Sequence, residues 1–171
     1  MRFLSMISTL GLTIALFAGA GVAADTQMRM KGEMKGGMMQ DMMQNPHHKL
    51  AMVYKKNLLN FANTLKSEIS RTGKVDKDFA ESAVKGMRDS LNQMQKHHNE
   101  AKGSMAEGMR TQKAEMIKMM EDRFDVVDGH LNNLEKEVKA DVPDPSKVKL
   151  ELDQIVKQCN MMKTKLQKKV K

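Results

Sequence analysis

Hydrophobic side chains recur at intervals of three and four residues from residue 50 onward, a period that predicts amphipathic helices. The first helix is predicted to begin with Asn45 as its cap and Pro46 as its first residue, and to end at Gly73. Asp76 is the predicted cap of the second helix. The inward positions of the first helix are Leu50, Val53, Leu58, Phe61, Leu65 and Ile69. Those of the second helix are Val84, Met87, Leu91, Met94, His98, Ala101 and Met105.

Glycines and prolines divide the second half of the chain. Gly103 and Gly108 predict a break between about residues 102 and 109, with one continuous long helix as the alternative. A third helix follows, and Pro143 and Pro145 end it before Ser146 caps a fourth. The inward positions of the third helix are Met116, Met120, Phe124, Val127, Leu131, Leu134 and Val138. Those of the fourth are Val148, Leu152, Ile155, Cys159, Met162 and Leu166.

Four amphipathic helices without a strand pattern predict an all-α protein. Short connections between successive helices favour antiparallel neighbours, so residues 46–171 are expected to form an antiparallel four-helix bundle. A segment of this length is large enough to bury a core of its own.

The first 24 residues have a different pattern. A short basic start precedes an apolar stretch from Phe3 to about Ala20, and small residues lie before Asp25 as they do before a cleavage site. We therefore predict a cleaved signal peptide at residues 1–24, with an uncleaved N-terminal membrane anchor as the alternative. No second long apolar run follows, so the cleaved chain is not expected to be an integral membrane protein. Export predicts a place outside the cytoplasm, in the bacterial periplasm.

Residues 25–45 are rich in methionine and interrupted by glycine. Gly32, Gly36 and Gly37 oppose a stable helix and no apolar period is sustained, so this segment is predicted to be a flexible tail. Its seven methionines are Met28, Met30, Met34, Met38, Met39, Met42 and Met43. These side chains have no core to fill. Metal capture explains their abundance, and contact with a membrane or with an apolar surface of a client protein is the alternative.

Charge and composition exclude several classes of function. The formal net charge of +8 at pH 7 favours anionic membrane surfaces or acidic partners. Nucleic acid is not an expected partner, because the chain has no platform of interleaved aromatic and basic residues. The chain has neither Cys-x-x-Cys-His nor inward Glu-x-x-His motifs, nor a nucleophile beside a base, so we do not expect an enzyme. Cys159, the single cysteine, is predicted to be a buried apolar residue, with an intermolecular disulfide or a soft metal ligand as alternatives.

Four of the five histidines fall where two helices are expected to meet. In a hairpin that turns near residue 73, residue 47 lies level with about residue 99. The end of the helices that carries His47, His48, His97 and His98 is called the histidine pole below, and the methionine-rich tail joins the helices there. Spacings of four residues place candidate ligands in pairs on one helix face. These pairs are His48 with Met52, Met94 with His98, and Met105 with Met109.

Thioether and imidazole ligands together select Cu(I) or Ag(I) over hard ions. Outside the cytoplasm free thiols tend to become disulfides, whereas methionine does not. The predicted metal ligands are therefore the tail methionines, the four histidines of the pole and Met52, Met94, Met105 and Met109. Zn(II) held by the histidines is the second choice. The structural alternative is that seam methionines such as Met94 and Met105 fill the core and that the histidine pairs are solvated helix ends.

A short stretch of the second helix resembles a known signature. His97, His98 and Ala101, with Met105 following, resemble the His-His-x-x-Ala-x-x-Met signature of small exported helical proteins associated with copper handling. Met105 falls one residue later than in that signature. The segment Asp76-Lys77-Asp78-Phe79 is similar to the Asp-x-Asp-Phe element of the same family. The resemblance implies copper binding, buffering or tolerance, carried by the histidine pole and the methionines near it.

The sequence thus predicts a periplasmic Cu(I) or Ag(I) binding protein that acts as a buffer, carrier or resistance factor. Its expected partners are metal ions and a periplasmic metal transporter. The alternative is an envelope stress chaperone that binds apolar segments of client proteins through methionine-rich surfaces. A third interpretation is a protein bound to the membrane surface.

Overall fold

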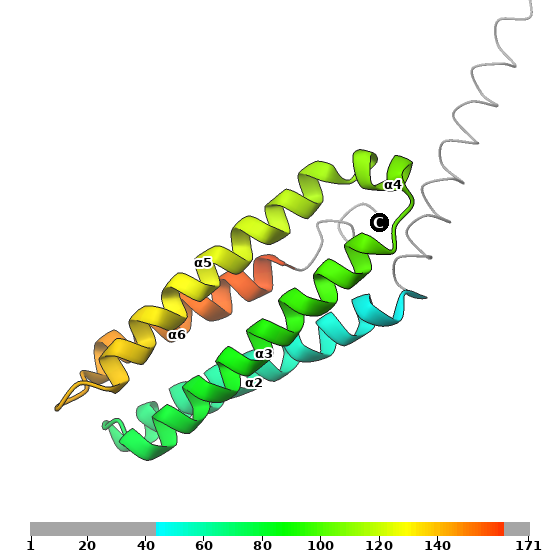
Figure 1. Cartoon of the computed structure of the whole chain (residues 1–171). Coiled ribbons are helices and arrows are strands. Elements are labelled where there is room, and N and C mark those ends of the chain that lie inside the picture. The colour runs from blue at the N-terminus through cyan, green and yellow to red at the C-terminus, as the bar shows by residue number, and fades with distance from the viewer. Residues whose placement is uncertain (1–43, 163–171) are drawn as a thin grey trace, which may run out of the picture. The chain divides into compact units, whose positions relative to one another are not determined.

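A computed structural model describes residues 44–162 of the chain. Within this range the structure is all-helical and has no strand, which confirms the predicted fold class at that level (Figure 1). The helices are α2 (Pro46–Thr72), α3 (Lys77–Gly103), α4 (Glu107–Gln112), α5 (Ala114–Val138) and α6 (Pro145–Met161). The predicted signal peptide, the seven tail methionines and Leu166 lie outside the described residues.

The four long helices pack as neighbours in pairs. Helix α2 lies against α3 and α5 lies against α6, while α3 also contacts α5 and α2 contacts α6 (Figure 1). Ion pairs follow the same neighbours: Lys66 of α2 pairs with Asp153 of α6, and Arg88 of α3 pairs with Asp128 of α5. None of the described helices is both long enough and apolar enough to cross a membrane.

Most predicted helix ends are confirmed by their capping hydrogen bonds. The side chain of Asn45 accepts from the backbone N–H groups of His47 and His48, and Pro46 is the first residue of α2. Helix α2 ends at Thr72 and is capped by Gly73, whose φ of 70° is a left-handed conformation that glycine adopts without strain. The side chain of Asp76 accepts from the N–H of Phe79, as predicted for the start of α3.

The predicted cap of the last helix is wrong. Asp144 caps α6, and its carboxylate accepts from the N–H of Ser146. Pro145 therefore stands at the first helical position rather than ahead of the helix. Proline suits that position because it has no N–H to leave unpaired. The residue before such a proline is the natural cap, and Asp144 carries the acceptor that a cap needs.

The predicted break after α3 is confirmed, and the alternative of one continuous helix is wrong. Helix α3 ends at Gly103, and the six-residue helix α4 begins at Glu107. A second interruption lies at Lys113, whose φ of −106° and ψ of 7° separate α4 from α5. Helix α4 buries no residue. It was not predicted because hydrophobic periodicity detects only helices with a buried face.

The core lies between the four long helices and includes most of the predicted inward positions. The fully buried large side chains are Leu58, Leu65, Met87, Leu91, Val127, Leu131, Leu134, Val138, Val148, Leu152, Ile155 and Cys159. Three predicted inward residues of α2 are instead partly exposed, namely Leu50, Val53 and Phe61. The buried face of α2 runs through Lys55, Leu58, Ala62, Leu65 and Ile69, so the true stripe is rotated from the predicted one. In α5, Ile117 is buried in place of Met116.

The partly exposed ring of Phe61 lies directly over α3. A Cβ atom added at Gly86 would fall 2.6 Å from the Cζ atom of Phe61. Gly86 therefore lets the aromatic ring of α2 rest on the backbone of α3, a contact that a larger residue would displace.

The single cysteine is buried in α6, as predicted. Burial raises the pKa of the Cys159 thiol to about 11, although the nearby Lys55 acts in the opposite direction. A shift of this size lowers the thiolate fraction at mildly alkaline pH by about 100-fold. We expect a thiol-specific chromogenic reagent to label the native protein slowly and the urea-unfolded protein at the rate of a free cysteine. Equal rates in the two states would contradict the burial of Cys159.

Candidate metal centre

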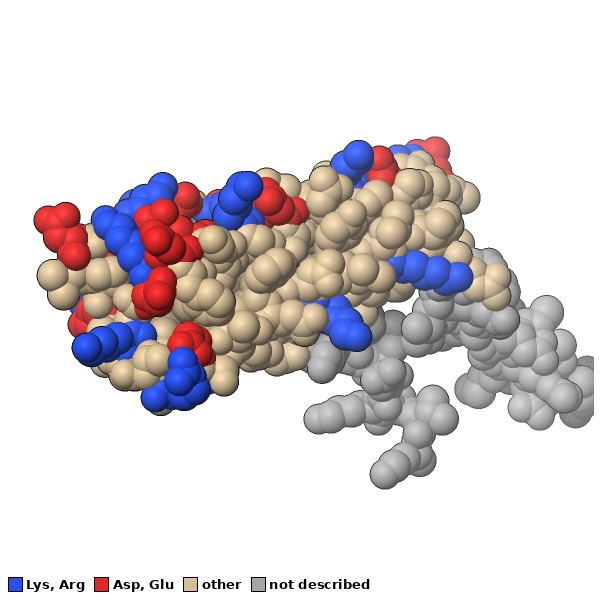
Figure 2. Space-filling model, turned by 90° about the horizontal axis from the view of Figure 1, so that it is seen from below, with Lys and Arg blue, Asp and Glu red and all other residues tan. Residues whose placement is uncertain are grey.

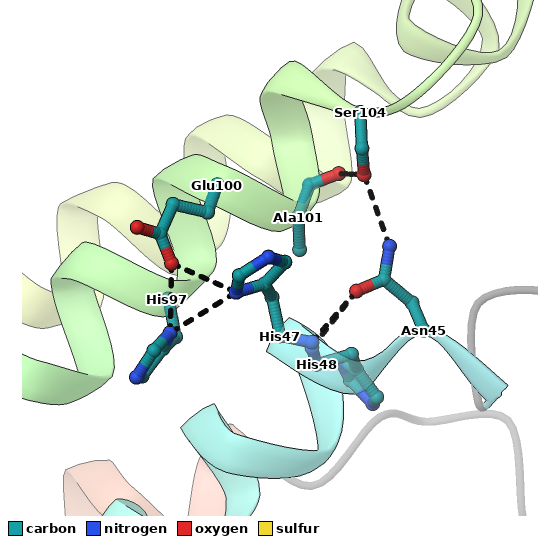
Figure 3. A network of polar contacts seen from close by, with 7 residues as sticks. All are labelled: Asn45, His47, His48, His97, Glu100, Ala101 and Ser104. Carbon is teal, nitrogen blue, oxygen red and sulfur yellow. Dashed lines mark hydrogen bonds and ion pairs between the residues drawn. The ribbon is translucent and has the colours of Figure 1, made fainter.

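Two helix ends meet at the histidine pole. His47 lies in the first turn of α2, and His97 and Glu100 lie in the last two turns of α3 (Figure 3). A polar link fixes the same ends: the side-chain amide of Asn45 donates to Ser104 Oγ at 3.0 Å. The Ser104 hydroxyl in turn donates to the backbone carbonyl of Ala101 at 2.9 Å. The cap of α2 is therefore tied to the residue that follows α3.

Three side-chain atoms converge at this junction. His47 Nδ1 and His97 Nδ1 each lie 2.8 Å from the same carboxylate oxygen, Glu100 Oε2. The two nitrogen atoms lie 3.2 Å from each other (Figure 3). His97 is the most enclosed of the three, with 12% of its side chain exposed, whereas His47 and Glu100 expose 39% and 38%. The group therefore has an inner wall and an open outer side.

This arrangement places two imidazole nitrogens against one carboxylate oxygen. A carboxylate oxygen only accepts hydrogen bonds, so an imidazole that hydrogen-bonds to Glu100 through Nδ1 donates from that atom. The two Nδ1 atoms also lie within hydrogen-bond distance of each other, and the tautomer of each ring decides which atom donates. A metal ion would be bound by the other tautomer, in which the hydrogen lies on Nε2 and Nδ1 directs a lone pair outward.

Aromatic stacking holds the inner histidine in place. The ring of His97 stacks on His47, with ring centroids 5.4 Å apart and an interplanar angle of 27°. It also stacks on Tyr54 of α2, with ring centroids 5.6 Å apart and an interplanar angle of 14°. A ring held by two stacking partners is already oriented before any ligand arrives, which lowers the entropic cost of binding.

The other two histidines of the pole form a separate group. His98 makes an edge contact with the ring of Phe124 at 5.2 Å between centroids. Among the described residues its Nε2 atom has no hydrogen-bond partner, and the nearest carboxylate oxygen, of Glu121, is 4.0 Å away. Glu121 is engaged by the ammonium group of Lys102 at 2.6 Å. This second group therefore carries a lysine charge that would repel a cation.

Burial lowers the pKa of both histidines in the second group. For His48 the larger cause of the lowered pKa is burial, and the charge of Lys113 acts in the same direction. Burial is also the largest cause of the lowered pKa of His98. The charge of Glu121 raises this pKa, whereas Lys102 and His48 lower it further. The two imidazoles are close enough to influence each other electrostatically, which agrees with their predicted place at one pole.

The structure thus brings together part of the predicted ligand set. His47 and His97 are in direct contact, and their neighbours His48 and His98 lie in the second group. Met94 is buried in the core with 2% of its surface exposed, which favours the core-filling alternative for that residue. Met52 is 44% exposed, and Met105 and Met109 are partly exposed in the segment that follows α3.

Glu100 is a candidate ligand that the sequence interpretation missed. It lies three residues after His97, a spacing that places both side chains on one face of α3. That spacing is visible in the sequence. A carboxylate is a hard ligand, however, and a prediction built on soft ligands does not include it.

Comparison of the chain with known protein families, with curated proteins and with solved structures finds no match. Its function is therefore inferred from the chemistry of its own residues.

The second histidine group predicts how stability depends on pH in the metal-free protein. The unfolded chain keeps His48 and His98 near the ordinary pKa of 6.5, whereas burial lowers both pKa values in the folded chain. The unfolded state therefore binds more protons as the pH falls below about 6.5, and the free energy of unfolding decreases in that range. Urea unfolding with a chelator present, at several pH values between about 7.5 and 5, measures this effect.

The variant His98→Gln is the control for this pH dependence, since glutamine does not titrate. We expect its stability to change less than that of the original chain over the same pH range. An identical pH dependence in the two proteins would show that His98 is not buried as described.

Proposed function

We propose that this protein is an exported metal-binding protein of the bacterial periplasm that buffers or carries Cu(I) or Ag(I), or confers resistance to them. The observation that carries the proposal is the contact of His47 with His97, with His48 and His98 beside them, at the end of α2 that the methionine-rich tail joins. Side chains of this kind meet repeatedly at metal sites, and here they come from two different helices.

The proposed molecule has three parts with separate tasks. Residues 1–24 direct export and are then removed. Residues 25–45 capture soft ions through their seven methionines. Residues 46–171 form an antiparallel four-helix bundle that presents the histidine pole, and the pairwise packing of α2, α3, α5 and α6 supports this arrangement. The tail is continuous with Asn45, the cap of α2, and we expect it to pass captured ions to the pole.

Anaerobic titration of the purified chain with Cu(I), against a chromophoric Cu(I) chelator, tests the proposal. We expect tight binding of more than one ion per chain. Two variants separate the parts: one replaces the seven tail methionines by leucine, and the other replaces His47, His48, His97 and His98 by alanine. Each is expected to bind fewer Cu(I) ions. Absence of Cu(I) binding at micromolar concentration in the original chain would overturn the proposal.

A second candidate is the envelope stress chaperone. Helix α2 exposes four large apolar side chains, Leu50, Met52, Val53 and Phe61, by 40% to 52%. Figure 2 shows one face of the described helices on which charged side chains gather mainly at one end and leave the middle largely uncharged. The exposed apolar side chains of α2 suit contact with apolar segments of client proteins. The test measures whether the metal-free protein suppresses the aggregation of a heat-unfolded client. Suppression that is lost when Val53 and Phe61 are replaced by serine would favour this candidate.

A further inference from the structure

We infer that His47, His97 and Glu100 form a site for one divalent borderline cation, Cu(II) or Zn(II), distinct from the sites of Cu(I). The inference rests on the proposed function only in that the chain binds metal at the histidine pole. It adds a second class of cargo, defined by charge and by ligand type.

The donor atoms favour a divalent ion. Two imidazole nitrogens and one carboxylate oxygen converge at this site, and no thioether is needed to complete the group. Imidazole suits copper and zinc in their divalent states, whereas a carboxylate is a poor ligand for Cu(I), which prefers sulfur. Metal binding requires deprotonated ligands, and two neutral imidazoles with one carboxylate then carry a single negative charge, which attracts a dication more strongly than a monocation.

The spacing of the three atoms fits ligands on one face of an ion. Metal–nitrogen and metal–oxygen bonds of about 2.0–2.1 Å separate neighbouring ligands by about 2.9 Å at a right angle and about 3.3 Å at the tetrahedral angle. The observed separations are 2.8, 2.8 and 3.2 Å. The three separations therefore match the spacing of three ligand atoms around one ion.

The remaining coordination positions point outward. His97 forms the enclosed wall, and His47 and Glu100 border the open side. A site with three protein ligands and an open side keeps water or an exogenous ligand on the metal, unlike a closed structural site. An ion held in this way can be exchanged, which suits a carrier or buffer.

The local charges distinguish this group from the second histidine group. Within residues 44–162 no lysine or arginine pairs with Glu100, whose recorded partners are His47 and His97. Glu121, near His98, is already neutralised by Lys102. Of the two groups, the first therefore offers its anionic oxygen to an incoming cation without competition from a lysine of residues 44–162.

Titration of the full purified chain with Zn(II) and, separately, with Cu(II) tests the inference. Competition with a chromophoric chelator gives the affinity for each ion, and electron paramagnetic resonance of the Cu(II) form reports nitrogen ligands directly. We expect one tight divalent ion per chain, with Cu(II) bound more tightly than Zn(II) as the order of divalent affinities requires.

Three variants locate the site. Glu100→Gln keeps the shape of a partly exposed side chain and is expected to weaken binding of both ions by at least about tenfold. His97→Gln is expected to do the same and to remove one nitrogen from the Cu(II) spectrum. His130→Gln is the matched control, because His130 pairs with Glu151 at 2.7 Å in the same way but belongs to no three-ligand group among the described residues. It is expected to bind both ions as the original chain does.

The outcomes separate the two proposals. Binding of Cu(I) without binding of Zn(II) or Cu(II) would overturn this inference and leave the proposed function standing. Divalent binding that is unchanged in Glu100→Gln and His97→Gln would also overturn it. Divalent binding that is lost in both variants, in a chain that does not bind Cu(I), would support the inference and overturn the soft-metal function.

Discussion

Zn(II) at one hundred times its dissociation constant is expected to raise the free energy of unfolding of this protein by about 2.7 kcal/mol. The reason is that the three ligands come together only in the folded chain. His47 belongs to the first turn of α2, whereas His97, which lies 50 residues later, and Glu100 belong to the end of α3. An ion at this junction therefore binds the native state and has little affinity for the unfolded one.

Differential scanning calorimetry or circular dichroism measures this stabilisation. For a chain of this size a change of about 1 kcal/mol corresponds to about 3 °C, so the unfolding midpoint is expected to rise by about 8 °C. The variant Glu100→Gln should lose most of the rise at the same Zn(II) concentration, whereas His130→Gln should keep it. A rise of equal size in all three proteins would place the zinc elsewhere on the chain.

Replacement of Leu131 by alanine is expected to lower the free energy of unfolding by about 2–5 kcal/mol. The side chain of Leu131 lies on α5 with 0% of its surface exposed and belongs to the core between the four long helices. Its removal costs the transfer free energy of the lost methyl groups and leaves a cavity. Urea unfolding followed by circular dichroism gives the free energy directly.

Leu150→Ala is the matched control for this loss. Leu150 lies on α6 with 57% of its surface exposed, so the same chemical change should alter stability by no more than about 0.5 kcal/mol. Similar losses in the two variants would mean that the core is not formed by the residues described here.

The fold was predictable where local chemistry and packing agree. Asn45, Gly73 and Asp76 mark helix ends because each satisfies a backbone group or adopts a conformation that few other residues allow. The rotated stripe of α2 was less predictable. Lys55 is buried while Leu50 and Val53 are partly exposed, and the helix faces two neighbours whose positions no local pattern reveals.

The position of the candidate site was predictable from the sequence. Which residues belong to it was less predictable. The meeting of His47 with His97 follows from the length of two helices joined near residue 73, because both rise by the same distance per residue. The division of the four histidines into two groups does not follow from spacing. It depends on which rings Tyr54 and Phe124 contact and on where Lys102 places its charge. Those are properties of the packed structure.

The stack of Tyr54 on His97 also gives the molecule a built-in optical signal. The chain contains one tyrosine and no tryptophan, so its tyrosine emission under ultraviolet excitation comes from Tyr54 alone. That phenol ring lies 5.6 Å, centroid to centroid, from an imidazole of the candidate metal centre. Paramagnetic Cu(II) at the centre would quench the emission and Zn(II), with its filled d shell, would leave most of it. Occupancy of the site can thus be followed in real time without attaching a dye.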